Sequence, residues 1–352
     1  MRGLAMTGET ASRPRVVIFS TGGTIASMRR GDHGAAPTLT GEELVAAVPQ
    51  LTEAAEVAVV PFRQVASSDL ALADVIRLAL EIKQAVAGGT KGVVVTQGTD
   101  TLEETAFALD LIWDGEEPVV LTGAMRGPSL PGADGPANLL AATLVAASPA
   151  ARGLGALVVF SDEVHLPLFV RKTHTTSPAT FRSLQAGPIG WIVENRPRIA
   201  LHPVVRHHIR LPSVPETIPP VALAKVSLGD DGRLLPVIAE LGYRGLVLEA
   251  TGGGHVPHVM TDPLADLARS IPVVLTSRTG AGEVLRSTYG FPGSETDLLA
   301  RGLIHAGVLD GLKAKLLLTL LLIAGAGRDR IAEAFATIGV PGSLPAFRWP
   351  KP

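Results

Sequence analysis

Residues 16–27 have the sequence VVIFSTGGTIAS, and this segment decides the fold class of the chain. Its four leading apolar residues, VVIF, are typical of a buried parallel strand. Gly22 and Gly23 then permit a tight turn, and the hydroxyls of Thr21 and Thr24 are expected to project at the end of the strand. Ligands of open α/β sheets bind outside the carboxyl ends of the strands, which makes this turn a candidate site. The segment fits neither GxGxxG nor GxxxxGK[ST], so a regular nucleotide-binding loop is not indicated.

Further apolar runs follow this segment, with helical patterns between them. The stretch from Leu72 to Val86 has an apolar period of about 3.6 residues, and the glycines at 88 and 89 predict its end. Helices between parallel strands require right-handed crossovers, which cover both faces of a sheet. The sequence therefore predicts an α/β fold whose larger N-terminal part is a doubly wound sheet. The predicted strands of this sheet lie at 16–19, 93–95, 118–122 and 156–160.

A proline-rich, basic stretch at residues 194–220 interrupts this alternation and predicts a domain border. We expect an N-terminal catalytic α/β domain over 15–200, a linker over 201–219 and a smaller C-terminal parallel α/β domain over 220–352. The C-terminal strands are expected at 221–226, 245–250 and 272–277, and the helices near 234–241, 262–269, 311–324 and 329–337.

The composition is that of a compact protein that recognises its substrate locally. Of the 352 residues, 46% are hydrophobic and 18% are charged, and the net charge of −2 gives no electrostatic footprint for nucleic acid or an anionic membrane. The apolar run from Leu316 to Ala326 is about half as long as a membrane span, so it is predicted to be a buried core helix. The chain has no cysteine, which excludes disulfides and cysteine metal sites. Residues 1–14 lack the pattern of a signal peptide, and a cytoplasmic location is expected.

A second motif, QGTDTLEE at residues 97–104, directly follows a predicted strand. Thr101 and Glu104 have the spacing of a capping box, so a helix is expected to begin at about residue 102. This start leaves Thr99 and Asp100 in the loop, at the same crevice as the first motif. Taken alone, the motif favours a simpler interpretation, in which Asp100 is a solvated carboxylate that stabilises the start of the helix.

A third motif, RKTHTT at residues 171–176, lies in a polar stretch after the strand that ends near Phe160. A threonine hydroxyl is a weak nucleophile that needs a base, and a lysine beside other polar groups can serve as one. Most lysines are solvated surface charges, however, and the sequence spacing does not show whether Lys172 reaches Thr99.

In this order and on these elements, the three motifs resemble those of the bacterial L-asparaginase and glutaminase-asparaginase family. The resemblance covers nearly the whole chain. It implies that Thr24 is the nucleophile and that Thr99, Asp100 and Lys172 complete the catalytic set, with Thr99 and Lys172 as a second hydroxyl–base pair. It also implies hydrolysis through an acyl-threonine without a cofactor. The histidines show no HExxH arrangement, so no metal is predicted.

The same resemblance implies a binding site for an amino-acid zwitterion. Ser67 of the segment VASSD matches the serine that binds the α-carboxylate, Asp100 would hold the α-ammonium, and the backbone of Ala124 in GAMR would line the pocket near the oxyanion. Ser68 stands where glutaminase-active relatives often carry a longer glutamine, which favours asparagine as the substrate. The alternative is that the two serines only cap a helix that begins at Leu70.

The chain departs from the family pattern at several positions. Gln97 replaces the usual histidine, and the stretch GAAP at 34–37 lacks the tyrosine that assists the nucleophile in relatives. Tyr289 is a possible substitute hydroxyl, although a buried structural tyrosine is the expected role. The glycine turn at 252–254 lacks the asparagine with which relatives touch the substrate of a neighbouring subunit. The segment DGP at 134–136 is expected to start a helix.

These observations predict an enzyme that converts L-asparagine and water to L-aspartate and ammonia. The expected partners are the small-molecule substrate and further copies of the chain, as a homodimer or homotetramer, with no nucleic acid and no membrane. Two alternatives remain open. The amide-hydrolysing subunit of a tRNA-dependent amidotransferase would be expected to carry an additional N-terminal module, and a non-catalytic amino-acid sensor would be expected to lose Thr24 or Lys172.

Overall fold

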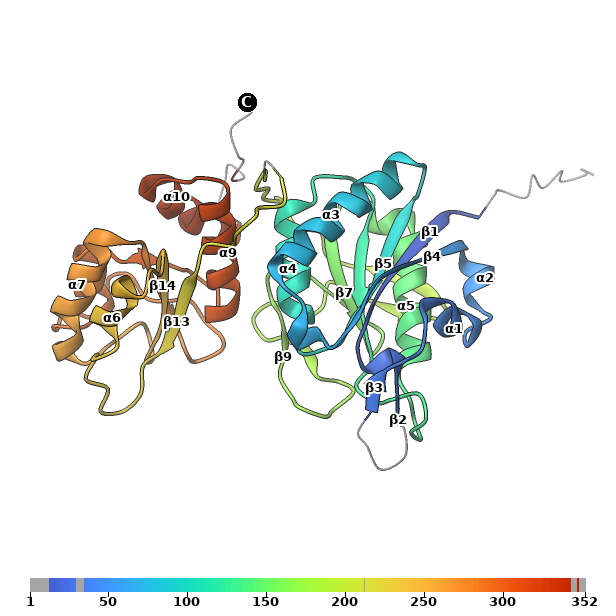
Figure 1. The fold of residues 1–352 in the computed structure, drawn as a ribbon, viewed down its shortest axis with the longest axis horizontal. Coiled ribbons are helices and arrows are strands. Elements are labelled where there is room, and N and C mark those ends of the chain that lie inside the picture. The colour runs from blue at the N-terminus through green and yellow to red at the C-terminus, as the bar shows by residue number, and fades with distance from the viewer. Residues whose placement is uncertain (1–12, 30–34, 212, 343–346, 348–352) are drawn as a thin grey trace, which may run out of the picture.

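The computed structural model describes residues 13–29, 35–211, 213–342 and 347. This part of the chain forms two α/β units, each built around its own sheet (Figure 1). The N-terminal sheet has eight strands and the C-terminal sheet has four. A larger and a smaller α/β unit in this order confirm the predicted fold class.

The strands of the larger sheet are, in chain order, β1 (Arg15–Gly22), β4 (Glu56–Val65), β5 (Gly92–Thr96), β6 (Val119–Thr122), β7 (Ala156–Phe160), β8 (Glu163–His165), β11 (Gly190–Val193) and β12 (Arg196–Ile199). Their order in the sheet is β12-β11-β8-β7-β6-β5-β1-β4. From β4 to β7 all neighbouring strands are parallel, whereas β8, β11 and β12 extend the sheet in antiparallel fashion. The four predicted strands of this unit are β1, β5, β6 and β7, and all of them are confirmed.

The strands that the sequence did not predict lie at the two ends of this sheet. β4 is an edge strand that contains Pro61, which has no N–H to donate and is tolerated at an edge. β11 and β12 form a hairpin whose turn residues, Glu194 and Asn195, have φ of 50° and 58°. β12 lies inside the proline-rich stretch, where no strand was predicted.

Helices cover both faces of the larger sheet, as expected of a doubly wound fold. On β1, Val17 and Phe19 belong to the cluster that includes α3 and α4, whereas Val16 and Ile18 belong to the cluster that includes α5. Side chains of a strand alternate between faces, so each face has its own core. The helices are α1 (Gly41–Ala46), α2 (Leu51–Ala54), α3 (Leu72–Ala87), α4 (Leu102–Ile112) and α5 (Gly135–Ala147).

The second unit has a parallel sheet of order β13-β14-β15-β16. Its strands are β13 (Val221–Lys225), β14 (Gly245–Ala250), β15 (Val273–Ser277) and β16 (Ile304–His305). Its helices are α6 (Leu235–Glu240), α7 (Thr261–Ser270), α8 (Glu295–Ala300), α9 (Gly311–Ile323) and α10 (Arg328–Ile338). Three of these strands and four of these helices were predicted, and the short elements β16 and α8 were not.

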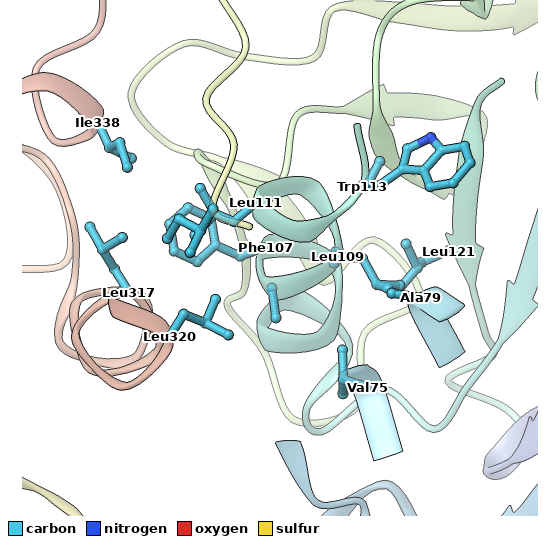
Figure 2. Packing of buried hydrophobic residues seen from close by; sticks show 14 of the residues in the cluster. Val75, Ala79, Phe107, Leu109, Leu111, Trp113, Leu121, Leu317, Leu320 and Ile338 are labelled. Carbon is cyan, nitrogen blue, oxygen red and sulfur yellow. The ribbon is translucent and has the colours of Figure 1, made fainter. Parts of the chain in front are cut away.

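Helix α9 joins the two units through its apolar surface. It packs on β13, β14 and β15 and also against α4 of the first unit. Figure 2 shows Leu317 and Leu320 of α9 near Phe107 of α4. The apolar run that begins at Leu316 is therefore a core helix, as predicted. Among the described residues, no helix combines the length and the apolar character that crossing a bilayer requires.

Candidate active site

The loops that follow β1, β4, β5 and β6 meet through their backbones. Gly23 has a φ of 86°, and a Cβ atom on it would lie 2.1 Å from the backbone nitrogen of Gly98. A Cβ atom on Gly98 would in turn lie 2.8 Å from the hydroxyl of Ser67, and one on Gly123 would lie 2.4 Å from the carbonyl oxygen of Gln97. Only glycine permits such contacts. The first two motifs therefore converge at the carboxyl ends of the strands, as the sequence predicted, and the Ser67 loop meets them there.

The two threonines of the first turn have different environments. Thr21 is 2% exposed and donates its hydroxyl to the carbonyl of Thr96 at 3.0 Å, so the expectation that it projects from the sheet is wrong. Thr24 begins a 3₁₀ turn, Thr24–Ala26, and is partly exposed. Ser27 holds this turn by donating its hydroxyl to the carbonyl of Gly23 at 2.8 Å. Of the two hydroxyls, only that of Thr24 is placed to meet a ligand.

Lys172 contacts Thr99 and Asp100 of the second motif through its ammonium group. It lies at the end of a short strand, β9 (Val170–Lys172), and its Nζ is 2.9 Å from the hydroxyl of Thr99 and 2.5 Å from Oδ1 of Asp100. Its side chain is only 17% exposed. The interpretation of Lys172 as a solvated surface charge is therefore wrong. Asp100 is exposed, as the simpler interpretation required, but its carboxylate is paired with an ammonium group.

Ser67 is buried and fixed by the second motif. Its Oγ accepts the backbone N–H of Asp100 at 3.2 Å, and its carbonyl accepts the hydroxyl of Thr101 at 2.8 Å. A hydroxyl that accepts from the backbone keeps its own proton for donation to a ligand. The hydroxyl of Thr101 also accepts from Nε2 of Gln97 at 3.2 Å, so Gln97, Thr101 and Ser67 form one chain of hydrogen bonds.

These contacts overturn two predictions about helix caps. α4 begins at Leu102 as predicted, but the hydroxyl of Thr101 bonds to Ser67 rather than to the first turn of its own helix, so the predicted capping box is absent. α3 begins at Leu72 and not at Leu70, and the carboxylate of Asp74 accepts the N–H of Ala71 at its start. The two serines therefore do not cap a helix at Leu70, and Ser68 is exposed.

Ala124 lies in the loop after β6, where α5 holds the backbone. The side chain of Ala124 is 1% exposed and belongs to the core beneath α5. Asp134 precedes α5 and accepts the backbone N–H groups of Met125 and Arg126, at 3.0 Å and 2.8 Å. Asn138 donates to the carbonyl of Gly123 at 3.0 Å. The structural role predicted for the segment DGP is confirmed, since α5 begins at Gly135.

The second unit presents an aromatic cluster around His255. Tyr289 and Phe291 pack edge-on against this imidazole, at 5.0 Å and 5.2 Å between ring centroids. The buried carboxylate of Glu295 contacts Nε2 of His255 at 3.1 Å and accepts the N–H of Tyr289 at 2.7 Å. Tyr289 is 46% exposed, so the expectation of a buried structural tyrosine is wrong.

Two further expectations concern the lid and metal binding. Gly34, at the start of the stretch that lacks the lid tyrosine, lies outside the described residues. Within the described ranges, no three His, Cys, Asp or Glu side chains are grouped closely enough to hold a metal ion.

Sequence reasoning missed Glu103, whose carboxylate accepts the backbone N–H of Lys172 at 2.5 Å. A signal for it was present. Glu103, Ala106, Phe107 and Asp110 recur at the spacing of one helix face, so the position is on the buried side of α4. A carboxylate at such a position needs a specific partner.

Family models match both units of the chain. The family model described as "Asparaginase, N-terminal" matches residues 15–205, and the one described as "Glutaminase/Asparaginase C-terminal domain" matches residues 220–335. The L-asparaginase of Bacillus licheniformis is 35% identical over 88% of this chain and 95% of its own length. The probable L-asparaginase of Deinococcus radiodurans is 38% identical over 92% of this chain and 98% of its own length.

A solved structure has the same fold. The probable cytoplasmic L-asparaginase from Campylobacter jejuni matches with a TM-score of 0.82 at 30% identity, over 92% of this chain and 99% of the other. Two family models in the order found here, together with relatives matched over nearly their full length, establish that this chain belongs to the asparaginase family.

Proposed function

We propose that this chain is an L-asparaginase, which converts L-asparagine and water to L-aspartate and ammonia. The observation that carries the proposal is the position of the Lys172 ammonium, which contacts the hydroxyl of Thr99 and the carboxylate of Asp100 at the edge where Thr24 is partly exposed. The named relatives, all called L-asparaginase or probable L-asparaginase, support the choice of reaction.

In the proposed reaction, Thr24 Oγ attacks the amide carbon of the substrate. The carbon–nitrogen bond breaks, the nitrogen leaves as ammonia after taking up a proton, and an ester links the acyl group to Thr24. Water then attacks the ester, aspartate leaves and the threonine regains its proton. Thr99 and Lys172 form the hydroxyl–amine pair that passes protons in these steps. The sequence of steps needs only side chains and water, so no cofactor is proposed.

The proposed binding site holds the amino-acid zwitterion at its two charged ends. The hydroxyl of Ser67 donates to the α-carboxylate, because its oxygen already accepts from the backbone of Asp100. The exposed carboxylate of Asp100 receives the α-ammonium. Ser68 lies beside Ser67 at the surface, and the backbone of Ala124 lines the pocket near the oxyanion.

The test is ammonia release by the purified protein with L-asparagine and with L-glutamine. Steady release from asparagine, with stoichiometric aspartate, is expected. Binding of asparagine without release would contradict the proposal and favour the amino-acid sensor. Release that appears only with a partner protein and a charged tRNA would favour the amidotransferase subunit.

We also propose that the enzyme works in the cytoplasm as a homodimer or homotetramer. A cytoplasmic location has support from the structural neighbour that is named a probable cytoplasmic L-asparaginase. A chain without cysteine is also indifferent to a reducing compartment. Cell fractionation with an antibody against the native protein tests the location, and recovery in a periplasmic fraction would contradict it.

A further inference from the structure

The strand that carries Lys172 is not part of the eight-stranded sheet. β9 pairs with β10 (Phe181–Ser183) in a separate antiparallel pair, and just beyond it Thr173 donates to the carbonyl of Thr180 at 2.8 Å. Alternate residues of a strand direct their N–H and C=O groups to the same neighbour. The N–H of Lys172 and the C=O of Val170 therefore lie together on the edge of β9 that faces away from β10. Polar backbone groups in the protein interior need partners.

The partner of the Lys172 N–H is Glu103, from the first turn of α4. Its Oε2 accepts this N–H at 2.5 Å, and the residue is only 5% exposed. Burial raises the pKa of Glu103, and the positive charge of Lys313 opposes this effect. α4 directly follows the loop that contains Thr99 and Asp100. The start of this helix therefore positions the backbone of Lys172, through Glu103, and also the two groups that the Lys172 ammonium contacts.

The partner of the Val170 carbonyl comes from the second unit. Lys313 of α9, which is 1% exposed, donates to this oxygen at 2.9 Å and to Asp310 at 3.1 Å. Arg171 also contacts the second unit, where it donates to the carbonyl of Gly280 at 2.8 Å. The second unit thus holds the start of β9, and the end that carries Lys172 depends on Glu103.

We propose that Glu103 is a positioning residue, whose carboxylate fixes the backbone of Lys172 so that the ammonium group stays on Thr99 and Asp100. The inference rests on the proposed catalytic role of Lys172. In this role, activity depends on whether the side chain of Glu103 is long enough for its oxygen to accept the N–H of Lys172, because that N–H carries no charge. In a role as a buried countercharge to Lys313, the negative charge would matter instead.

Two substitutions distinguish the length of the Glu103 side chain from its negative charge. Glu103→Gln keeps an acceptor oxygen at the same distance and removes the charge, whereas Glu103→Asp keeps the charge and withdraws the oxygen by about 1.5 Å. A misplacement of about 1 Å in a catalytic group costs up to ~10²-fold in rate. We expect E103D to lower kcat for asparagine by roughly tenfold to a hundredfold, with a much smaller change in KM, and E103Q to stay within about threefold of wild type.

Glu104→Asp and Glu104→Gln are matched controls. Glu104 is the next residue of α4, and no hydrogen bond joins it to Lys172 in the described residues. Both controls are expected to keep wild-type kcat and melting temperature. Full activity in E103D, or an E103Q variant as impaired as E103D, would overturn the proposal. Loss of the folded state in E103D, with E104D folded, would also overturn it, since Glu103 would then support the fold.

Lys172→Met, assayed beside these variants, separates this inference from the proposed function. Wild-type activity in K172M would remove the catalytic role of Lys172 and with it the basis of the inference. A large loss in K172M together with full activity in E103D would leave the proposed function intact and overturn the positioning role of Glu103 alone.

Discussion

Thr21 and Thr24 lie three residues apart, at the end of β1 and in the turn that follows it, and their hydroxyls have different environments. Thr21 is buried and donates to the carbonyl of Thr96, whereas Thr24 is partly exposed at the carboxyl ends of the strands. We expect Thr24→Ala to lower kcat/KM for asparagine by more than about 10³-fold, since loss of a nucleophile removes the covalent route, with little change in melting temperature.

Thr21→Val is the complementary control. It should cost roughly 1–3 kcal/mol in the free energy of unfolding, because the carbonyl of Thr96 loses its donor, and it should keep most of the activity. Ammonia release and thermal unfolding, measured on both variants, check this pair of effects. A folded T24A variant with near-wild-type turnover would end the assignment of the nucleophile.

Ser68 is the residue at which substrate choice is expected to be decided. It is exposed beside the buried Ser67, and its short side chain can make few contacts with a longer substrate such as glutamine. We expect the enzyme to prefer asparagine to glutamine in kcat/KM, and Ser68→Gln to narrow the gap within the ~10–200-fold range that one methylene group allows. The measurement is kcat/KM for both substrates on both proteins. Equal ratios in the two proteins, or a wild type that prefers glutamine, would refute this account.

At the scale of the elements, the glycine contacts between the loops after β1 and β5 yield a further prediction. A methyl group on Gly98 would lie 2.8 Å from Ser67 Oγ and 3.1 Å from the Cα of Gly23, so Gly98→Ala must push these loops apart. Overpacking of this kind costs typically ~1–3 kcal/mol. We expect a higher KM for asparagine and a lower kcat, with a moderate fall in melting temperature.

Gly327→Ala is the control for this substitution, because a Cβ atom there meets no atom within 4 Å. Kinetics and thermal unfolding of both variants are the measurements. A G98A variant with wild-type KM and kcat would show that the contact between these loops does not set the geometry of the site.

The elements also show which parts of this molecule the sequence could predict. β1, β5, β6 and β7 were found because buried parallel strands are continuous apolar runs bounded by turns. The edge strand β4 was not predicted, because polar residues and Pro61 on its exposed side interrupt the apolar run. The capping box of Thr101 was predicted from local spacing, but its hydroxyl donates instead to the carbonyl of Ser67, which is distant in sequence.

The residues of the candidate site could be named from the sequence as expectations, whereas their contacts could not. Thr24, Thr99 and Lys172 were named from motifs, yet the bond between Lys172 and Thr99 joins positions 73 residues apart and depends on the path of β9. The spacing of α4 indicated that Glu103 is buried, but its partner is a backbone N–H, which every residue except proline has, so the sequence did not reveal the contact with Lys172.

At the scale of the whole molecule, a partly buried carboxyl near the linker predicts a dependence of stability on pH. Burial raises the pKa of Asp110 from 3.8 to about 6, although the guanidinium of Arg206 and the N–H of Ala156 oppose the shift. The folded state therefore holds a proton that the unfolded state has lost between pH 3.8 and about 6. Stability from this group is present below pH 3.8 and is lost as the pH rises through about 6.

His165 has the opposite effect in an overlapping range. Burial and the nearby Arg182 lower its pKa from 6.5 to about 4, so its contribution is lost as the pH falls. Both proteins in a comparison of wild type with Asp110→Asn contain His165, and its effect cancels in the difference. We expect the melting temperature of D110N minus that of wild type to rise between pH 4 and pH 6.5. A difference that stays flat or falls over this range would contradict the raised pKa of Asp110.

Assembly is the last property at this scale. The resemblance to the family implies pockets built from the first domain of one subunit and the second domain of its neighbour, and the second unit exposes Tyr289 and Phe291 beside His255. We expect the active species to be at least a dimer. Sedimentation at assay concentration, with activity followed in the same fractions, is the measurement, and an active monomer would refute the shared pocket.

The backbone contacts at Gly23, Gly98 and Gly123 also bear on how such an enzyme evolves. The floor of the site leaves no room for a Cβ atom at any of these three positions, so its shape depends on the absence of side chains there. The exposed Ser68 can then diverge among descendants without rebuilding that floor. Replacement of any of the three glycines, by contrast, would displace the loops, so changes at little cost to folding are expected at exposed positions such as Ser68.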